Sequence, residues 1–443
     1  MFKSRKKTNA LPGRQIVTER ETVFAVHSNS VRFGPNALTE AGDAARDLGM
    51  KRVALFTDSH LASATPWPDE VRKALANAGC EVAVYADVRV EPTDASFLAA
   101  VDFYKTGRFD GIVSVGGGSV MDTAKAALLY AAYPAPFLDY VAAPYGRVLP
   151  VPGPLPPHIA CPTTSGTGAE CTGIAVFDFE ANAIKTVIAH KWLKPSLALI
   201  DPRVAATMTP GVLASSGFDV FTHAIESYTA KPYFERERPK TSAARPMSQG
   251  ANPWSDLGSL EAIRLGGRYL VRAVKDRQDH EAREGLMFAA TLAGIAFGNS
   301  GVHLPHAMSY AVAGLCHSYT ASGYEQNRPM VPHGISVVLN APSAFRFTAS
   351  ACPQRHLDCA AALGADIAGV KLVEAGEALA DALTKLMRQA DLPNGLSALG
   401  YGETDLDALA KGAATQPRLL NNSPRPVTET ELREIFKGAL RLW

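Results

Sequence analysis

Two side chains able to bind a metal lie four residues apart in GFDVFTHAIESY, residues 217–228. This stretch has the periodicity of an amphipathic helix, so Asp219 and His223 fall on one helical face with Cβ atoms roughly 5–6 Å apart. A carboxylate oxygen and an imidazole nitrogen can then converge on one divalent cation, and Glu226 could support the histidine from behind. The pair alone also fits an acidic residue near a helix N-terminus followed by a partly buried histidine.

Three further histidines, His303, His306 and His333, follow in the motifs HLPHAMSY and VPHG. A divalent site takes three or four protein ligands, and one carboxylate with imidazoles but no thiolate favours Fe(II) or Zn(II) over Mg(II) or Ca(II). His333 lies in a Pro-His-Gly turn, where a stiff backbone would hold its ring. Helical spacing leaves His303 and His306 as alternatives, because both could reach one face.

Two glycine-rich loops in the first half of the chain have the composition of nucleotide-binding turns. GGGS (residues 116–119) follows the apolar strand FDGIVSV and opens a helix, and CPTTSGTGAECT (residues 161–172) follows the strand HIAC. Glycines let the backbone approach a phosphate, and a helix N-terminus offers free N–H groups. The GxGxxG fingerprint is absent, and one such loop alone is often only a tight turn. Two of them at one sheet edge, with the hydroxyls of Thr163, Thr164 and Thr167, favour a nucleotide.

Asp58 and Lys185 are further candidates near this nucleotide. Asp58 ends the strand KRVALFT and could accept hydrogen bonds from ribose hydroxyls, or it could cap the next helix. Lys185 could reach a phosphate or ribose oxygen, or it could be an ordinary solvated lysine.

The secondary-structure elements that must position these residues change from alternating strands and helices to helices alone along the chain. Strand and helix patterns alternate up to SLALIDPRV, which predicts a parallel α/β sheet with ligands at the carboxyl ends of its strands. From Thr209-Pro210 onward the pattern is helical. We therefore predict a basic tail (1–20), an α/β dinucleotide-binding domain (21–205) and an all-helical metal-binding domain (206–443).

The helical half is interrupted by a loop, residues 231–256, rich in Pro, Arg and Ser. Loops of this length are usually functional or disordered. Its Arg236, Arg238 and Arg245, and also Arg328 further on, could bind a substrate carboxylate or lie on a solvated surface.

Composition excludes several classes of protein. Of the 443 residues, 47% are hydrophobic and 20% are charged, which is typical of a globular protein and argues against disorder. A net charge of +1 gives no electrostatic basis for binding nucleic acid or membranes. No apolar run approaches the ~20 residues needed to span a bilayer.

The six cysteines form no CxxC pair, which predicts reduced thiols and a cytoplasmic location. The start, MFKSRKKTNALPGR, is basic but has no apolar segment, so it does not read as a secretory signal. We expect a disordered tail, with an organellar transit peptide and a mitochondrial matrix location as the alternative.

The combination of GGGSVMDTAK, PTTSGTGAE, Asp219-x-x-x-His223, HLPHAMSY and VPHG resembles the iron-containing (group III) alcohol dehydrogenases over nearly the whole chain. The resemblance implies a Rossmann-like domain, a helical metal-binding domain and a cleft between them, in the general architecture shared with dehydroquinate synthase relatives. It implies Fe(II), with Zn(II) as the alternative, at Asp219, His223, His306 and His333, and so selects His306 over His303. It also implies NAD, favoured over NADP by Asp58, at a set of matched positions: Asp58, Gly117, Gly118, Ser119, Asp122, Thr163, Thr164, Thr167, Thr172 and Lys185.

Within the family, segments such as VRVEPTDASF, GFDVFTHAIESYTAKPY and NPWSD resemble a transhydrogenase subgroup. That likeness implies a hydride moved from a hydroxy acid such as 4-hydroxybutyrate to an oxo acid such as 2-oxoglutarate, through bound NAD and with the metal as Lewis acid. Many family members have a second histidine four residues after the third ligand. Here that position is Tyr310, which could serve in proton transfer or be structural.

Other functions stay open at this point. The main alternative is an NAD- and metal-dependent alcohol or semialdehyde dehydrogenase whose cofactor exchanges freely. A non-catalytic scaffold is disfavoured because all four ligand positions and both glycine loops are present. The family also suggests a homodimer.

Overall fold

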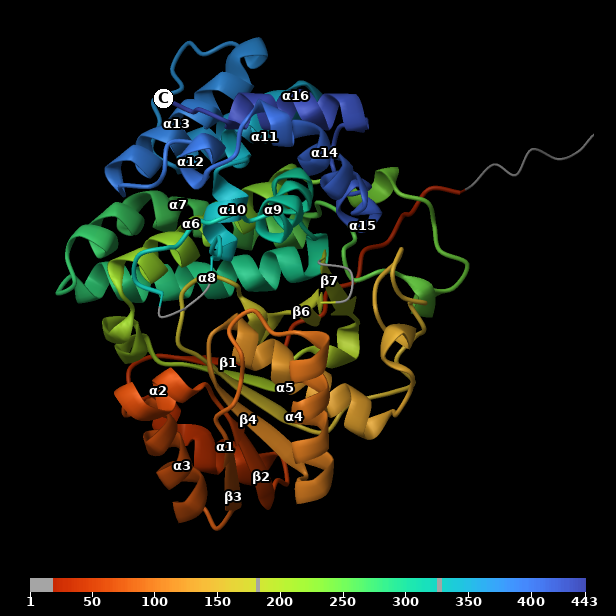
Figure 1. The fold of residues 1–443 in the computed structure, drawn as a ribbon, viewed down its shortest axis with the longest axis vertical. Coiled ribbons are helices and arrows are strands. Elements are labelled where there is room, and N and C mark those ends of the chain that lie inside the picture. The colour runs from red at the N-terminus through yellow and green to blue at the C-terminus, as the bar shows by residue number, and fades with distance from the viewer. Residues whose placement is uncertain (1–18, 181–183, 325–328) are drawn as a thin grey trace, which may run out of the picture.

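The computed structural model describes residues 19–180, 184–324 and 329–443. A parallel sheet flanked by helices forms one part of the molecule, and a larger helical part packs on it (Figure 1). This arrangement confirms the predicted α/β domain followed by helices. All but two residues of the predicted basic tail, and Arg328, lie outside the described residues.

The N-terminal half forms a six-stranded parallel sheet in the order β1-β8-β5-β4-β2-β3. Strands β4 and β5 are buried along their whole length, which explains why their sequences are continuous apolar runs. The strands are β1 (Ser30–Phe33), β2 (Arg52–Phe56), β3 (Glu81–Tyr85), β4 (Gly111–Gly116), β5 (His158–Pro162) and β8 (Leu197–Ile200). The helices are α1 (Ala41–Asp47), α2 (Ser59–Ala64), α3 (Trp67–Asn77), α4 (Asp94–Gly107) and α5 (Gly118–Ala132).

An antiparallel hairpin stands apart from this sheet. Its strands are β6 (Ile174–Phe179) and β7 (Ile184–Ala189). Asp122 of α5 accepts a hydrogen bond from the backbone N–H of Val176 at 3.0 Å, which ties the hairpin to the sheet domain. The hairpin therefore lies between the glycine loops and the helical part (Figure 1).

The helical half begins where Thr209 caps α6, its hydroxyl accepting from the N–H of Val212. Helices α6, α7 and α8 pack together along their length, and the shorter helices cover them (Figure 1). The predicted boundary near residue 205 falls in the 3-10 turn Pro202–Thr207 that joins β8 to α6. The helices are α6 (Pro210–Thr229), α7 (Pro253–Lys275), α8 (His280–Ser300), α9 (Leu304–Gly314), α10 (His333–Val338), α11 (Ala341–Thr348), α12 (Pro353–Ala362), α13 (Ala375–Gln389), α14 (Leu406–Ala414), α15 (Pro417–Leu420) and α16 (Glu429–Ala439).

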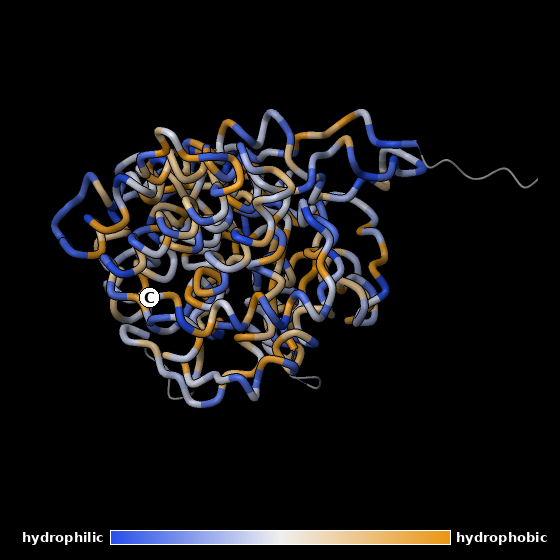
Figure 2. The backbone as a smooth tube through the Cα atoms, turned by 90° about the horizontal axis from the view of Figure 1, so that it is seen from above, coloured by the Kyte–Doolittle hydropathy of each residue, from blue (hydrophilic) through white to orange (hydrophobic). Residues whose placement is uncertain are grey.

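The apolar core is continuous from the sheet into the helices. One cluster of buried side chains includes Val53 and Ile159 of the sheet together with Phe218 of α6 and Phe345 of α11. Hydrophilic stretches lie at the rim of the molecule (Figure 2). Within the described part of the chain, no single helix is long and apolar enough to cross a membrane, and α8 and α9 meet that test only as a pair bent by 102°.

The long loop is held by the N-terminal segment. Its backbone pairs with residues 19–21 through the N–H of Glu21 and the carbonyl of Arg236, and through the N–H of Arg238 and the carbonyl of Glu19. Asn252 caps α7, so the irregular stretch ends there. The loop is therefore packed along the surface of the helical part.

Candidate functional site

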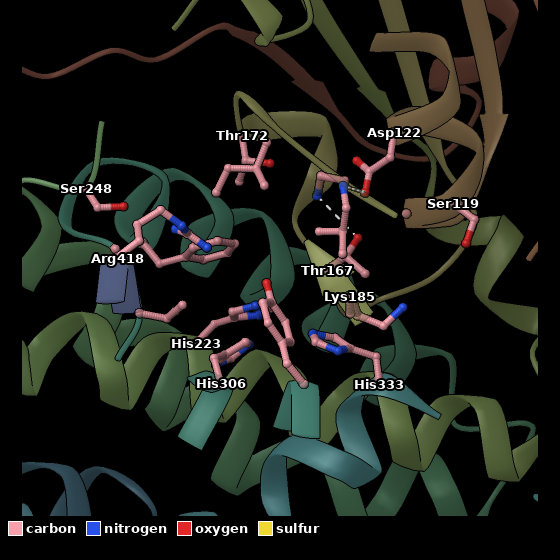
Figure 3. A pocket seen from close by; sticks show the side chains of 18 of the residues that line it. Ser119, Asp122, Thr167, Thr172, Lys185, His223, Ser248, His306, His333 and Arg418 are labelled. Atoms are coloured by element: carbon pink, nitrogen blue, oxygen red, sulfur yellow. Dashed lines mark hydrogen bonds between the residues drawn. The ribbon is translucent and has the colours of Figure 1, made fainter. Parts of the chain in front are cut away.

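The four predicted metal ligands come together at one point. Asp219 and His223 lie one turn apart on α6, His306 lies in the first turn of α9, and His333 begins α10. One potential ligand atom from each lies within 4.8 Å of the other three. Figure 3 shows the three imidazoles facing a common cavity.

The spacing of these atoms leaves room for a cation between them. Oδ1 of Asp219 lies 3.5 Å from Nε2 of His306 and 3.8 Å from Nε2 of His333, and Oδ2 lies 3.7 Å from Nδ1 of His223. These separations are too long for good hydrogen bonds. Accordingly Oδ1 of Asp219, Nδ1 of His223 and Nε2 of His306 are buried without a partner among the described residues. Unpaired buried polar atoms are destabilising, so this set fits a bound divalent metal.

Burial and the neighbouring charges set the protonation of the ligands. Burial would raise the pKa of Asp219, but His223, His333 and His306 outweigh it and hold that pKa well below its usual range. Burial lowers the pKa of His223 to about 3, whereas at His306 burial is outweighed by Glu226 and Asp219, which raise the pKa to about 9. Because a metal binds a neutral imidazole and an ionised carboxylate, metal binding requires His306 to release a proton.

Glu226 decides between the two histidines that spacing could not separate. Its carboxylate accepts from the backbone N–H of His303 at 2.7 Å and of His306 at 3.3 Å, and it pairs with Nδ1 of His306. The side chain of His303 points elsewhere, with Nε2 3.0 Å from the hydroxyl of Thr229. Glu226 therefore orients His306, and the expectation that it supports His223 is wrong.

His223 is instead positioned by ring stacking. Its imidazole lies 4.0 Å from the ring of Phe297, nearly parallel at 4°, and 4.5 Å from that of His306. Phe297 is itself buried on α8, so it provides a fixed surface against which the ring of His223 packs.

Two cavities, a larger and a smaller one, meet at the metal cluster. Both are lined by Gly118, Ser119 and Thr167 from the two glycine loops and by His333 from the cluster. The larger cavity contains seven of the ten predicted cofactor positions: Asp58, Gly117, Gly118, Ser119, Thr163, Thr164 and Thr167. The other three, Asp122, Thr172 and Lys185, line the smaller one.

The two glycine loops lie directly against each other. A Cβ atom on Gly118 would come within 2.8 Å of Cγ2 of Thr167, so a larger residue would force the loops apart. This contact explains the glycine at the start of α5, whose first two residues, Gly118 and Ser119, line both cavities.

The position of Asp58 is compatible with both interpretations of its sequence. Its Oδ1 accepts from the N–H of Leu61 at 2.8 Å and caps α2, and the residue also lines the larger cavity. The second carboxylate oxygen has no protein donor within the described residues. A negative charge therefore faces the cavity.

Asp122 and Lys185 are more constrained than the sequence indicates. Lys125, fully buried, lies 3.2 Å from the carboxylate of Asp122, which also holds β6. The ammonium of Lys185 is paired with Glu91 and lies 2.7 Å from Asp178. Burial opposes the charge of Lys185, but the two carboxylates outweigh it and raise the pKa. Lys185 is thus buried and charged, with its charge balanced by two carboxylates, and it is not the solvated lysine that was the alternative.

The smaller cavity extends past the metal cluster, away from the glycine loops. Its far end is formed by Ser248, Phe297, Val302, Tyr310 and Arg418. Tyr310 is buried, its hydroxyl has no hydrogen-bond partner among the described residues, and burial raises its pKa, so it stays protonated.

The loop arginines considered from the sequence do not line either cavity. Arg236 donates to Asn422 at 2.7 Å, Arg238 pairs with Glu19, and Arg245 pairs with Glu21 at 3.0 Å. The arginine that does line the smaller cavity is Arg418. Nothing in the spacing around QPRLL singled it out, because only the tertiary packing of α15 brings it there.

Fold and site together define a metal-dependent oxidoreductase with a nucleotide cavity beside its metal. Comparison with known proteins gives the family. The family description "Iron-containing alcohol dehydrogenase" matches residues 28–202, and "Fe-containing alcohol dehydrogenase family, C-terminal" matches residues 246–440. The chain belongs to the iron-containing alcohol dehydrogenase family.

Individual relatives cover nearly the whole chain. The "Hydroxyacid-oxoacid transhydrogenase, mitochondrial" of Rattus norvegicus is 46% identical over 422 residues, 95% of this chain and 90% of that protein. The protein of that name from Xenopus tropicalis is 47% identical over 431 residues, 96% of this chain and 93% of that protein. Among solved structures, 1,3-propanediol oxidoreductase (30% identical) and an alcohol dehydrogenase from Oenococcus oeni (26% identical) both superpose with a TM-score of 0.82 over 94% of this chain and 100% of theirs.

These relationships confirm the predicted family, its likeness to the transhydrogenase subgroup, and an enzyme that acts on CH–OH groups with NAD and iron. The predicted cytoplasmic location finds no support, since the matched transhydrogenases are named as mitochondrial.

Proposed function

We propose that this enzyme moves a hydride from a short hydroxy acid of the 4-hydroxybutyrate type to an oxo acid of the 2-oxoglutarate type through NAD that stays bound. The observation that carries the proposal is the shared wall of the two cavities. His333 and the glycine loops line both, so a dinucleotide in the larger cavity ends beside the metal ligands and the smaller cavity. Relatives that are 45–47% identical and named for this reaction add support.

Each part of the chain has a defined task in this proposal. Asp219, His223, His306 and His333 hold the cation. When bound, NAD carries the hydride and a divalent cation supplies Lewis acidity at the substrate oxygen. The ten cofactor positions bind the dinucleotide, and the charge of Asp58 disfavours a 2′-phosphate.

The smaller cavity positions the substrate. Phe297 and Val302 provide apolar walls that exclude water next to the imidazoles. The protonated hydroxyl of Tyr310 donates a hydrogen bond to a substrate oxygen and can hand over a proton there. The hydroxy acid loses one hydride and one proton and the oxo acid gains both, so no free nicotinamide is consumed.

Acceptor dependence tests the proposal. Purified, metal-loaded enzyme without added NAD should oxidise 4-hydroxybutyrate catalytically only when 2-oxoglutarate is present. With the hydroxy acid alone, the absorbance band of reduced nicotinamide should rise by one equivalent per bound cofactor and remain with the protein after gel filtration. Release of free NADH with no need for the oxo acid would instead establish the dehydrogenase with exchanging cofactor.

A second measurement addresses the scaffold alternative. His333→Ala removes one of the four ligands, so it should abolish metal retention and turnover while thermal unfolding stays cooperative. Full activity of His333→Ala would contradict the metal site.

Location and assembly complete the proposal. The mitochondrial names of the relatives favour the mitochondrial matrix, with the basic N-terminal stretch acting as a transit peptide. The homodimer remains a prediction from the family resemblance. Import into isolated mitochondria and light scattering on the purified protein test the two points.

A further inference from the structure

The far end of the smaller cavity contains a cation without a counter-charge. In Figure 3, Arg418 and Ser248 lie on one side of the imidazoles, and Ser119 and Lys185 of the cofactor side lie on the other. Lys185 and Arg418 are the two lysine or arginine side chains among the described residues lining this cavity. Lys185 has two carboxylate partners, whereas Arg418 has no ion pair or hydrogen bond within the described parts of the chain.

Three other half-buried arginines of this protein have carboxylate partners, whereas Arg236 and the buried Arg283 donate to an amide or carbonyl oxygen. Arg355 pairs with Asp256, Arg425 with Glu431 at 3.2 Å, and Arg245 with Glu21. A guanidinium that is partly removed from water is stabilised by an anion that accepts its N–H groups, above all a carboxylate. Arg418 therefore has no anionic partner among the described residues, and a ligand carboxylate in the cavity can supply one.

The segment that presents Arg418 is held rigidly. Its neighbour Leu419 is 1% exposed and packs with Phe297, Val302 and Tyr310 in a small apolar cluster. The wall of the cavity thus includes the same side chains that anchor α15. The backbone that carries Arg418 is therefore held in place beside the cavity.

Asn422, just after α15, connects this segment to the long loop. Its side chain donates to the carbonyls of Ser300 at 3.2 Å and Val302 at 3.1 Å, and accepts from Arg236 at 2.7 Å. Its backbone carbonyl accepts from the N–H of Lys231 at 2.9 Å. Ser248 of the same loop lines the cavity directly. The loop therefore contacts the segment that bears Arg418 at Asn422 and reaches the cavity at Ser248.

We propose that Arg418 binds the carboxylate of the substrate, with the hydroxyl of Ser248 as a neighbouring donor, and that Arg236 positions this segment through Asn422. The inference rests on the proposed function for the identity of the substrates. It assigns the long loop a role in substrate selection: the loop arginine does not touch the substrate and instead supports the arginine that does.

Substitution of Arg418 tests the direct contact. Charge-assisted hydrogen bonds contribute about 1.5–3 kcal/mol, which is roughly a 10- to 150-fold effect. In single-turnover reduction of the bound NAD by metal-loaded enzyme without an oxo acid, Arg418→Met should raise the half-saturating concentration of 4-hydroxybutyrate, written KM below, by a factor in that range. The ratio of kcat/KM for 4-hydroxybutyrate to that for butan-1-ol should fall similarly. Arg418→Lys should recover part of the loss, which a purely structural role would not predict. An unchanged KM, or equal losses for both alcohols, would overturn the proposal.

The indirect role has its own matched pair of variants. Arg236→Met should raise KM for 4-hydroxybutyrate about 3- to 10-fold, in the range of one lost hydrogen bond to Asn422. Arg238→Met removes a neighbouring loop arginine that is 53% exposed and pairs with Glu19, so it should leave KM within about twofold. Equal effects of the two variants would show that the loop acts nonspecifically.

These outcomes are separable from failure of the proposed function. If the wild-type enzyme releases NADH freely, retention of the cofactor is refuted. If Arg418→Met in that case still loses its selectivity for the carboxylate substrate, the carboxylate site stands. Acceptor-dependent turnover that is indifferent to Arg418 would keep the transhydrogenase and refute the site.

Discussion

Replacement of Glu226 by glutamine tests how the metal cluster is organised. Glu226 is completely buried, and its carboxylate contacts three groups at the start of α9: two backbone N–H groups and Nδ1 of His306. Glutamine keeps the size of the side chain and one carbonyl oxygen, so the backbone N–H groups retain their acceptor. The change is therefore confined to the atom that faces the imidazole.

The new amide nitrogen would face an imidazole N–H, placing two donors against each other. The ring can relieve this conflict by moving its proton to Nε2, the atom 3.5 Å from Asp219 that must be free to coordinate the metal. Loss of a carboxylate that orients a ligating histidine typically lowers metal affinity 10- to 100-fold. We expect a loss in that range, equivalent to about 1.4–2.7 kcal/mol of binding free energy.

Competition with a chromophoric chelator at pH 7 measures this affinity for Zn(II), and anaerobically for Fe(II). Glu170→Gln serves as the control, because Glu170 is another glutamate only 3% exposed, and it does not belong to the ligand cluster. Both variants should unfold cooperatively without metal, and only Glu226→Gln should bind it more weakly. Metal affinity within threefold of wild type in Glu226→Gln would refute the role assigned to this carboxylate.

Three further substitutions address the cofactor cavity and the buried charges. Asp58→Ser keeps a helix N-cap and removes the charge facing the cavity, so the ratio of the Kd for NAD to the Kd for NADP, titrated on nucleotide-free protein, should rise at least about tenfold. An unchanged ratio would remove Asp58 from cofactor selection. Gly118→Ala brings a Cβ within 2.8 Å of Thr167 and should weaken NAD binding about tenfold in a fluorescence titration, while Gly402→Ala, with no close neighbour, should not. Burial raises the pKa of Glu170 to about 7, above its value of 4.5 when exposed. Between these two pH values the folded state binds a proton that the unfolded state has lost. The free energy of unfolding therefore falls as pH rises from 4.5 to 7. Glu170→Gln should therefore gain stability relative to wild type between pH 5 and pH 8, by up to about 3 kcal/mol in urea unfolding, and a difference independent of pH would count against the buried charge.

Local periodicity made much of the fold readable from the sequence. The fully buried strands β4 and β5 appear as apolar runs followed by glycine or hydroxyl residues, and Thr209-Pro210 marks the start of α6. The hairpin of β6 and β7 escaped prediction. Its register depends on contacts with α5, such as the one between Asp122 and Val176, that no local pattern encodes.

The candidate site likewise contains residues that could be predicted from the sequence and residues that could not. Asp219 and His223 are four residues apart, so helical geometry alone brings them together. The choice of His306 over His303 required the family resemblance, because the deciding contact comes from Glu226, eighty residues earlier. The sequence around Lys185 does not indicate its two carboxylate partners, and the sequence around Arg418 does not indicate that it lines the cavity.

The residues proposed to bind the metal and those proposed to bind the substrate come from different kinds of structural element. The groups proposed to bind the metal belong to helices α6, α9 and α10, whose packing in the core fixes their positions. The groups inferred to bind the substrate come from the long loop and the four-residue helix α15, which are short or irregular segments held by the packing of Leu419 and the hydrogen bonds of Asn422. Irregular segments tolerate changes in sequence that core helices do not. We therefore expect substitutions at Ser248 and Arg418 to alter which alcohol is oxidised while metal affinity is retained, and substitutions at Glu226 or His306 to affect every substrate equally.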